Sequence, residues 1–126
     1  MVPIRIKNLF AALEKRPLVP FPAPREKLQA PLTHGVYVIR DRGERVLHVG
    51  RTLYGKSGLR QRLRNHITGQ SSFVRAALHG DTTKLRNGCT YQFLGVPNAR
   101  ERLLLEYYAT VCLGPKHLGV GKTTRD

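Results

Sequence analysis

The chain has 126 residues, a length that suits one domain with a single hydrophobic core. It carries 22 Lys and Arg against 8 Asp and Glu, a formal net charge of +14. No stretch has the roughly 20 consecutive apolar residues that a membrane-spanning helix requires, so the sequence excludes such a helix. The large positive charge favours a polyanionic partner.

Nucleic acid is the expected partner, because such a charge excess is typical of proteins that bind a phosphate backbone. A membrane surface is disfavoured, since the basic residues form no one-sided amphipathic helix with aromatic anchors. Charged residues interrupt the first 16 positions, which argues against a secretory signal and for an intracellular, cytoplasmic protein. The two cysteines, Cys89 and Cys112, have no zinc-like spacing and are expected to be reduced, semi-buried thiols.

The N-terminal third divides into a helix and a connector. Apolar residues near helical spacing predict a short helix over 3–16, which looks like an appendage. Five prolines between Pro17 and Pro31 predict an extended connector that lies over the domain. We therefore expect the N-terminal helix and proline-rich connector in 1–32, the domain proper in 33–115 and a basic C-terminal tail in 116–126.

The rest of the chain predicts an α/β (α+β) domain in which about three strands form a small mixed sheet flanked by helices. The order is ββααβα, after the N-terminal helix. The expected elements are strands 35–40 and 45–50, helices at about 57–68 and 71–79, strand 89–95 and a last helix at about 98–113.

The segment 35–50 is predicted to form a β-hairpin with a tyrosine near one end and a histidine near the other. A two-residue turn at 42–43, or a four-residue loop symmetrical about it, would place Tyr37 directly opposite His48. Directly opposed side chains on one face are close enough to share a hydrogen bond, a water or a phosphate oxygen. The alternative is an ordinary amphipathic cross-strand pair that covers the core.

The helix expected over 58–69 has a core stripe made of Leu59, Leu63 and Ile67. Arg62 and His66 lie one turn apart beside that stripe, at the boundary between core and solvent. Arg60 and Arg64 form a similar pair further round the helix. An arginine fork at such a boundary suits a phosphate, although a solvated basic face is the simpler interpretation.

Glu106 is the only charged residue in the apolar stretch 103–113. A carboxylate in such surroundings must be paired, protonated or bound to a cation. Pairing with Arg102, one turn earlier, is one explanation. A metal site is the other, because one carboxylate with waters and a substrate phosphate is a common way to hold Mg²⁺.

The sequence GVGKTT at 119–124 looks like a phosphate-binding loop but fails the pattern. The required glycine five positions before Gly121 is Lys116, and too few residues follow to form a helix. We expect a flexible basic tail there.

Taken together, these features resemble the GIY-YIG nuclease domain. The resemblance is carried by GVY at 35–37, HVGR at 48–51, Arg62 and His66 on the next helix, and Glu106 in the last helix. The matches occur in this order along most of the chain.

The resemblance implies a divalent-metal-dependent endonuclease that hydrolyses phosphodiester bonds, most commonly in DNA. It implies that Tyr37 is the general base or orients the water, and that Arg62 contacts the phosphate. It further implies that His66 is an accessory proton or hydrogen-bonding group and that Glu106 is the ligand of Mg²⁺ or Mn²⁺. The second motif normally carries tyrosine where this chain has His48, whose imidazole could itself act as the base.

A second departure concerns the C-terminus, where the family often places an asparagine a few residues past a proline and this chain has none after Pro115. A nucleic-acid-binding module with little or no catalysis therefore stays as an alternative, as does a nuclease for RNA or single strands. The oligomeric state, monomer or homodimer, is open. The basic residues expected to contact the nucleic acid backbone are Arg51, Lys56, Arg60 and Arg64.

Overall fold

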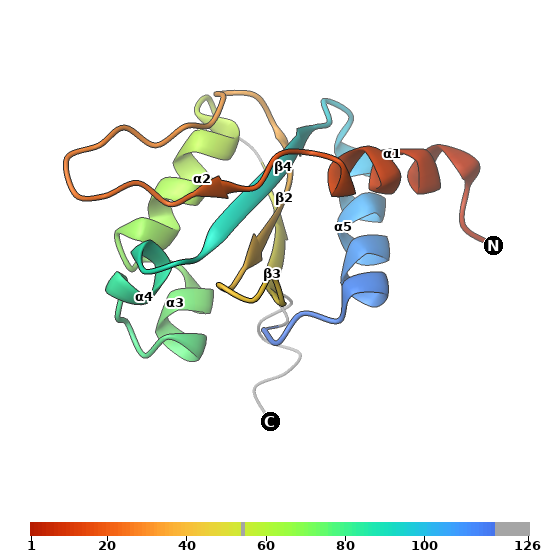
Figure 1. Cartoon of the computed structure of the whole chain (residues 1–126). Helices are drawn as coiled ribbons and strands as arrows, with labels where there is room; N and C mark the ends of the chain where they lie inside the picture. Colours follow the sequence, from red (N-terminus) through yellow and green to blue (C-terminus); the bar gives the residue numbers. More distant parts are fainter. Residues whose placement is uncertain (54, 118–126) are drawn as a thin grey trace.

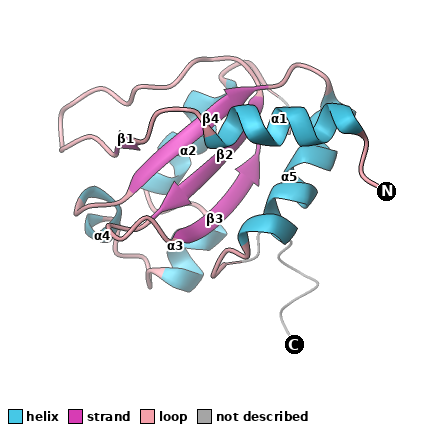
Figure 2. Ribbon diagram, turned by 45° about the vertical axis from the view of Figure 1, so that its right-hand side comes forward, coloured by secondary structure: helices cyan, strands magenta, loops and turns pink. Residues whose placement is uncertain are grey.

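The computed structural model describes residues 1–53 and 55–117 (Figures 1 and 2). Its elements are α1 (Ile4–Glu14), β1 (Val19–Pro20), β2 (Gly35–Arg40), β3 (Val46–Arg51), α2 (Gly58–Ile67), α3 (Ser72–Ala77), α4 (Thr83–Arg86), β4 (Thr90–Gly95) and α5 (Ala99–Leu113). The expected ββααβα order is present, with β1 and the short α4 added. The motif at 119–124 lies outside the described residues, as does most of the predicted tail.

The sheet has the strand order β1-β4-β2-β3, and all three neighbouring pairs are antiparallel. The predicted fold class is confirmed, but the sheet is antiparallel rather than mixed and has a fourth strand. That strand is Val19–Pro20, paired with Tyr91 and Thr90. A proline is tolerated there because β1 is at the edge of the sheet and needs few ladder bonds.

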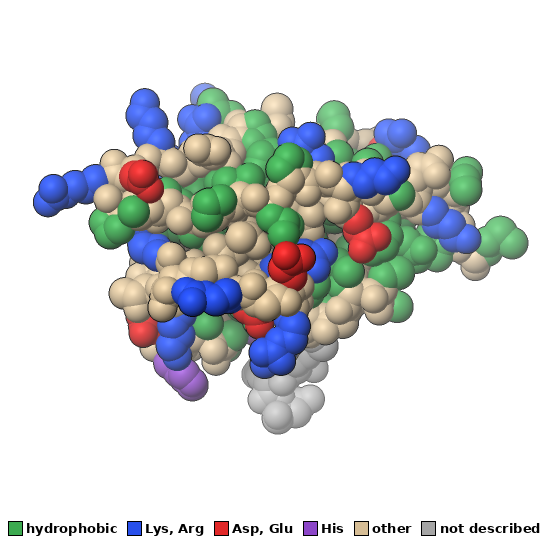
Figure 3. All heavy atoms as spheres, viewed as in Figure 1, with side chains coloured by type: hydrophobic (Ala, Val, Ile, Leu, Met, Phe, Trp, Pro, Cys, Tyr) green, Lys and Arg blue, Asp and Glu red, His purple; other side chains and the backbone are tan. Residues whose placement is uncertain are grey.

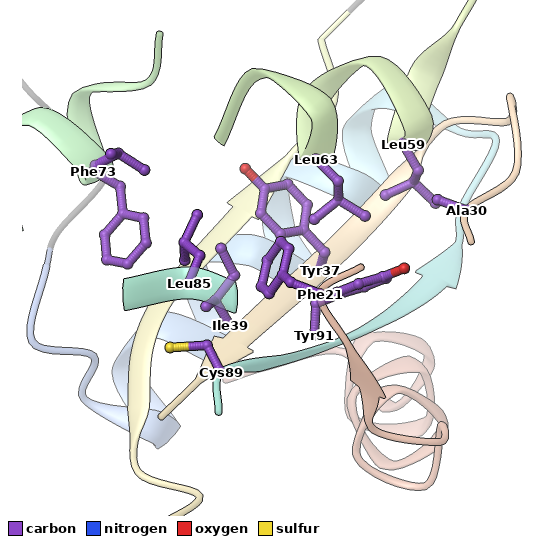
Figure 4. Packing of buried hydrophobic residues seen from close by; sticks show 11 residues of the cluster. Phe21, Ala30, Tyr37, Ile39, Leu59, Leu63, Phe73, Leu85, Cys89 and Tyr91 are labelled. Carbon is purple, nitrogen blue, oxygen red and sulfur yellow. The ribbon is translucent and has the colours of Figure 1, made fainter. Parts of the chain in front are cut away.

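The sheet forms the middle layer between two groups of helices (Figure 1). On one face, the alternating side chains of β2 at Tyr37 and Ile39 pack with Leu59 and Leu63 of α2, as seen in Figure 4. On the other face, Val36 and the strands around it pack against α5 and α1. Both faces are therefore buried, which explains why β2 has five buried residues in succession.

Helix α1 is part of the core and not the appendage that the sequence suggested. Its Leu13 side chain is fully buried in the cluster beneath α5, and Phe10 packs edge-on against Tyr108 of α5 at 5.3 Å between ring centroids. Arg5 also forms an exposed ion pair with Glu101. The sequence hid this role because α1 and its partner surface on α5 are far apart in the chain.

The proline-rich connector lies against α2, as expected for a segment that covers the domain (Figure 2). The carbonyl of Thr33 accepts a hydrogen bond from the Leu59 N–H at 2.9 Å, and the carbonyl of Pro31 accepts one from the Arg60 N–H at 3.0 Å. These are among the first N–H groups of α2, which have no partner inside the helix. The connector thus caps the helix and fixes where it begins.

The hairpin β2–β3 has a different register from the predicted one. Tyr37 is opposite Gly50, and His48 is opposite Ile39. The turn contains three residues, because Asp41 and Arg45 close it by hydrogen bonds, and Glu44 adopts a left-handed φ of 64°. A β-bulge between Ile39 and Arg40 shifts the register by one further residue.

Each single-residue shift alone would turn the side chains of β3 to the opposite face of the sheet from the predicted one. The two shifts together return them to the predicted face. Tyr37 and His48 therefore still share a face, as diagonal rather than opposed neighbours, with ring centroids 5.9 Å apart. The predicted proximity is right and the predicted pairing is wrong.

None of the described helices is both long and apolar enough to cross a bilayer. Both cysteines are free thiols, with Cys89 buried and Cys112 exposed rather than semi-buried.

Candidate active site

The Tyr37 side chain lies beneath Gly50 of the neighbouring strand. A Cβ atom at position 50 would be 2.4 Å from the Tyr37 hydroxyl oxygen, so only glycine leaves room for the ring. The hydroxyl makes a 2.7 Å hydrogen bond with Nε2 of His66, and it points away from the rest of the apolar cluster in Figure 4. Burial raises the pKa of Tyr37 to about 12, although the nearby Arg62 guanidinium acts in the opposite direction.

His66 is fully buried and is held from both ring nitrogens. Its Nδ1 makes a 2.7 Å hydrogen bond with Oγ of Ser71, which also accepts from the Val74 N–H and so caps α3. Burial holds the pKa of His66 well below its usual range, so the imidazole is neutral at pH 7. A continuous hydrogen-bonded row therefore runs from Ser71 through His66 to Tyr37.

His48 is almost fully buried, with 2% of its surface exposed, and stacks on Phe73 with 4.9 Å between ring centroids. Its Nδ1 lies 3.2 Å from Nδ1 of His117. Its Nε2 is buried and has no hydrogen-bond partner among the described residues. Burial, with smaller contributions from the His117 and Arg62 charges, lowers the pKa of His48 to about 3.

His117 is a site residue that sequence reasoning missed, because it was placed in the tail. Its N–H donates to the carbonyl of Leu47 at 2.9 Å, so the chain after α5 returns alongside the outer edge of β3. A signal was present in the sequence: Gly114 and Pro115 end α5 and let the chain turn back toward the sheet.

Glu106 reaches the site from the opposite layer of the fold. Helix α5 packs on the face of the sheet that does not carry Tyr37, yet Glu106 lines a pocket together with His48. This is feasible because β3 is an edge strand, so the carboxylate passes its outer side. The carboxylate forms a part-buried ion pair with Arg51 at the end of β3. Burial raises the pKa of Glu106, and Arg51 and Arg62 oppose that rise.

Arg102 is not the partner of Glu106, contrary to the pairing considered from the sequence. Its buried guanidinium donates to four backbone carbonyls, those of Thr52, Leu53, Val96 and Pro97. These carbonyls belong to the segments that follow β3 and β4. Arg102 therefore fixes the loop at Thr52 and Leu53, which forms one wall of the pocket.

The pocket has a volume of about 550 Å³ and contains three of the five predicted catalytic residues. It is lined by His48, Gly50, Arg51, Thr52, Leu53, Gly55, Lys56, Ser57, Gly58, Gln61, Arg62, Asn65 and Glu106. Tyr37 and His66 do not line it: both are fully buried, and Tyr37 lies under Gly50, which does. The structure thus places an exposed layer of charged groups above a buried layer of neutral proton-handling groups.

The four residues expected to bind the nucleic acid backbone fall into two groups. Arg51 and Lys56 line this pocket, whereas Arg60 and Arg64 line a second hollow between α2 and the connector. Helical spacing places Arg60 and Arg64 further round the helix than Arg62, but it does not show that the connector forms the other wall of their hollow.

The donor set suits one hard cation held mainly by water and substrate. Within residues 1–53 and 55–117, no group of three or more His, Cys, Asp or Glu side chains could enclose a metal ion. Glu106 is the single carboxylate in the pocket. Mg²⁺ is often held by one or two carboxylates with several waters and phosphate oxygens, so this chemistry fits, provided that Glu106 separates from Arg51.

No protein-family model matches the chain, and no curated protein matches it. Among solved structures, it is similar to the GIY-YIG N-terminal endonuclease domain of UvrC from Thermotoga maritima, a domain bound to its catalytic divalent cation, magnesium. The TM-score is 0.51 at 22% sequence identity, over 70% of this chain and 85% of that one. The chain has a GIY-YIG-like fold. Two point mutants of the same UvrC domain give the same TM-score and identity over 84% of their chains.

This likeness confirms, for the fold, the resemblance inferred from the short motifs. The neighbours themselves are endonuclease domains. The chemistry of this chain depends on its own residues.

Proposed function

We propose that the protein is a metal-dependent endonuclease that hydrolyses phosphodiester bonds in DNA. The observation that carries this proposal is the convergence of His48, Arg62 and Glu106, from a strand and two helices, in one cationic pocket. An imidazole, a guanidinium and a carboxylate are the groups needed to accept a proton, stabilise phosphate charge and hold a cation.

His48 is the proposed proton acceptor. When its Nδ1 donates to His117, the unpartnered Nε2 carries the lone pair that would accept the proton. A base with a pKa of about 3 is weak at neutral pH. The negative charge of a bound phosphodiester favours the imidazolium form and so raises that pKa toward the working range.

Tyr37 and His66 are proposed to hold the site rather than to exchange protons with solvent. Their hydroxyl and imidazole are hydrogen-bonded to each other below the pocket, and the raised pKa keeps the phenol protonated. The Tyr37 hydroxyl could act as a base only if a cation near Arg62 lowered its pKa.

Arg62 is half-buried on the pocket side of α2, which suits a bidentate contact with a phosphate. Glu106 would hold Mg²⁺ or Mn²⁺ with waters and a phosphate oxygen. When bound, such a cation supplies Lewis-acid stabilisation of the charge that develops on the phosphate.

Nicking of supercoiled plasmid DNA tests the proposal. We expect cleavage with Mg²⁺, none with EDTA, and a loss of about 100-fold or more in Glu106→Gln, which keeps the shape but removes the charge. Glu14→Gln is the matched control, because Glu14 is exposed on α1, and it should leave the rate unchanged. Cleavage by Glu106→Gln at the unaltered rate would refute the assigned role.

A second candidate function is a nucleic-acid-binding module with little or no catalysis. The ion pair between Arg51 and Glu106 favours it, since the carboxylate is already neutralised without a metal. Under this alternative the unaltered chain binds DNA but leaves the plasmid intact with both Mg²⁺ and Mn²⁺. A parallel panel of duplex DNA, single strands and RNA at fixed salt would identify the preferred substrate.

A further inference from the structure

A second cationic hollow lies on the other side of α2 from the candidate active site. Its volume is about 490 Å³. It is lined by Pro22, Arg25, Glu26, Lys27, Leu28, Arg60, Arg64, Ile67 and Arg86. Five of these residues are basic, and one carries a carboxylate. The connector contributes more than half of these residues, and it runs beside α2 in Figures 1 and 2. Several Lys and Arg side chains lie on this side of the molecule in Figure 3.

The walls of this hollow are held in place by hydrogen bonds to the connector backbone. Nε of Arg60 donates to the carbonyl of Ala30 at 2.8 Å, and the Arg86 guanidinium donates to the carbonyl of Pro22. The carboxylate of Glu26 accepts from the Ala23 N–H, so it is engaged within its own loop. The guanidinium of Arg64 and the ammonium of Lys27 are exposed.

Helical geometry separates the two hollows. Side chains advance by about 100° per residue along an α-helix, so Arg60 and Arg64 point to one side of α2 while Arg62 points to nearly the opposite side. An α-helix with its side chains is about 10–12 Å across, close to the roughly 12 Å width of a DNA major groove. The two hollows therefore flank α2 on the sides where phosphates would lie if the helix entered a major groove.

The lining favours a phosphate backbone over a membrane surface. Binding to a bilayer needs exposed aromatic or large apolar anchors beside the cations. The exposed large apolar residues of the described chain, such as Leu18, Leu32 and Leu53, do not line this hollow. Five basic side chains, two of which are fixed by hydrogen bonds to the connector backbone, are instead suited to the regularly spaced phosphates of a nucleic acid.

We propose that the hollow between the connector and α2 is a second DNA-backbone site, so that the DNA cut at the first pocket crosses α2. This proposal rests on the proposed function for the identity of the substrate. The connector thereby acquires a role in substrate binding, in addition to capping the helix.

Salt-dependent binding of a fluorescent DNA duplex, measured by anisotropy in EDTA, tests the proposal without any cleavage. The logarithm of the binding constant falls with the logarithm of salt concentration by about 0.9 for each phosphate contact. Lys27→Gln combined with Arg64→Gln should therefore lower that slope by about 1 to 2. Lys7→Gln combined with Lys15→Gln removes the same charge from α1 and the residue that follows it, and should change the slope little.

Equal changes of slope in the two double variants would refute a local site and leave only a general effect of net charge. All four positions are exposed, so thermal unfolding should differ little among the proteins. Should the first double variant unfold, Arg64→Gln alone must lower the slope by about 0.9 and Arg64→Lys must restore it. If the Lys27→Gln and Arg64→Gln variant lowers the salt slope but the unaltered protein does not nick plasmid, the second site is supported and the proposed function is refuted. If the unaltered protein nicks plasmid but the variant leaves the salt slope unchanged, the proposed function is supported and the second site is refuted.

Discussion

Mild acid should destabilise this protein through its buried histidines. His48 and His66 are both neutral in the fold, because burial lowers the pKa of His48 to about 3 and that of His66 well below its usual range. In the unfolded chain both should titrate near 6.5. Below that pH the unfolded state binds protons that the folded state does not, so the free energy of unfolding falls as the pH falls.

The magnitude follows from the pKa of His48. Between pH 7 and pH 5, a histidine that titrates near 6.5 when unfolded and stays neutral when folded loses about 2 kcal/mol of stability. His66 should add about as much if it also stays neutral at pH 5. A total near 4 kcal/mol is a large share of the roughly 5–15 kcal/mol that stabilises a typical domain. The loss is complete only at the folded-state pKa, near pH 3 for His48.

Urea denaturation at half-unit steps from pH 7.5 to pH 5 would measure this dependence. His48→Gln removes one of the three histidines whose pKa is lowered in the fold, the others being His66 and His117, so its stability should fall less steeply with pH, whatever its stability at pH 7. Equal steepness in the variant and the unaltered protein would refute the assignment. The exposed His79, replaced by Gln, provides a control substitution at the surface.

Three further substitutions probe the packing around the site. Gly50→Ala should destabilise the fold by about 1–3 kcal/mol in urea denaturation, because its Cβ would overlap the Tyr37 ring, and the cost should vanish in a Tyr37→Ala background. Arg102→Met should lower the free energy of unfolding by about 3 kcal/mol or more, because buried carbonyls that now accept hydrogen bonds from the guanidinium would lose their donor. Thermal unfolding would measure this loss, and a loss below about 1 kcal/mol would contradict the reasoning. Arg51→Gln should reduce the Mg²⁺ concentration needed for half-maximal plasmid nicking, because Glu106 no longer has a competing cation; an increased requirement would show that Arg51 assists the metal.

The sequence predicts most of the fold because each main element carries a clear apolar pattern. The uninterrupted apolar run in 35–39 and the stripe at Leu59 and Leu63 both reflect contacts with a core that a single domain must contain. The hairpin register failed for a local reason: the left-handed conformation of Glu44 and the adjacent β-bulge have no strong residue signature. β1 was missed because its one proline, Pro20, and the prolines on either side of it argue against a strand.

The site was predictable to the extent that its residues lie on regular elements. Arg62 and His66 follow from helical spacing, and Glu106 from its isolation in an apolar helix. Contacts between distant segments were not predictable, and they decide the details. Arg102 is one helical turn from Glu106 in the sequence, but its guanidinium binds backbone carbonyls. Arg51 is distant in the sequence, and only the three-dimensional packing shows that it forms the ion pair with Glu106.

The pKa values of the two motif residues set limits on how the site can work. Tyr37 at about 12 and His48 at about 3 are both neutral at pH 7, so the buried layer carries no charge. The charges all lie in the pocket above, where Arg51, Lys56 and Arg62 outnumber Glu106. A phosphodiester entering this pocket would bring the negative charge that favours a protonated imidazole. In the proposed mechanism, an imidazole at position 48 therefore makes the base dependent on bound substrate, and activity should depend on substrate charge more steeply than binding does.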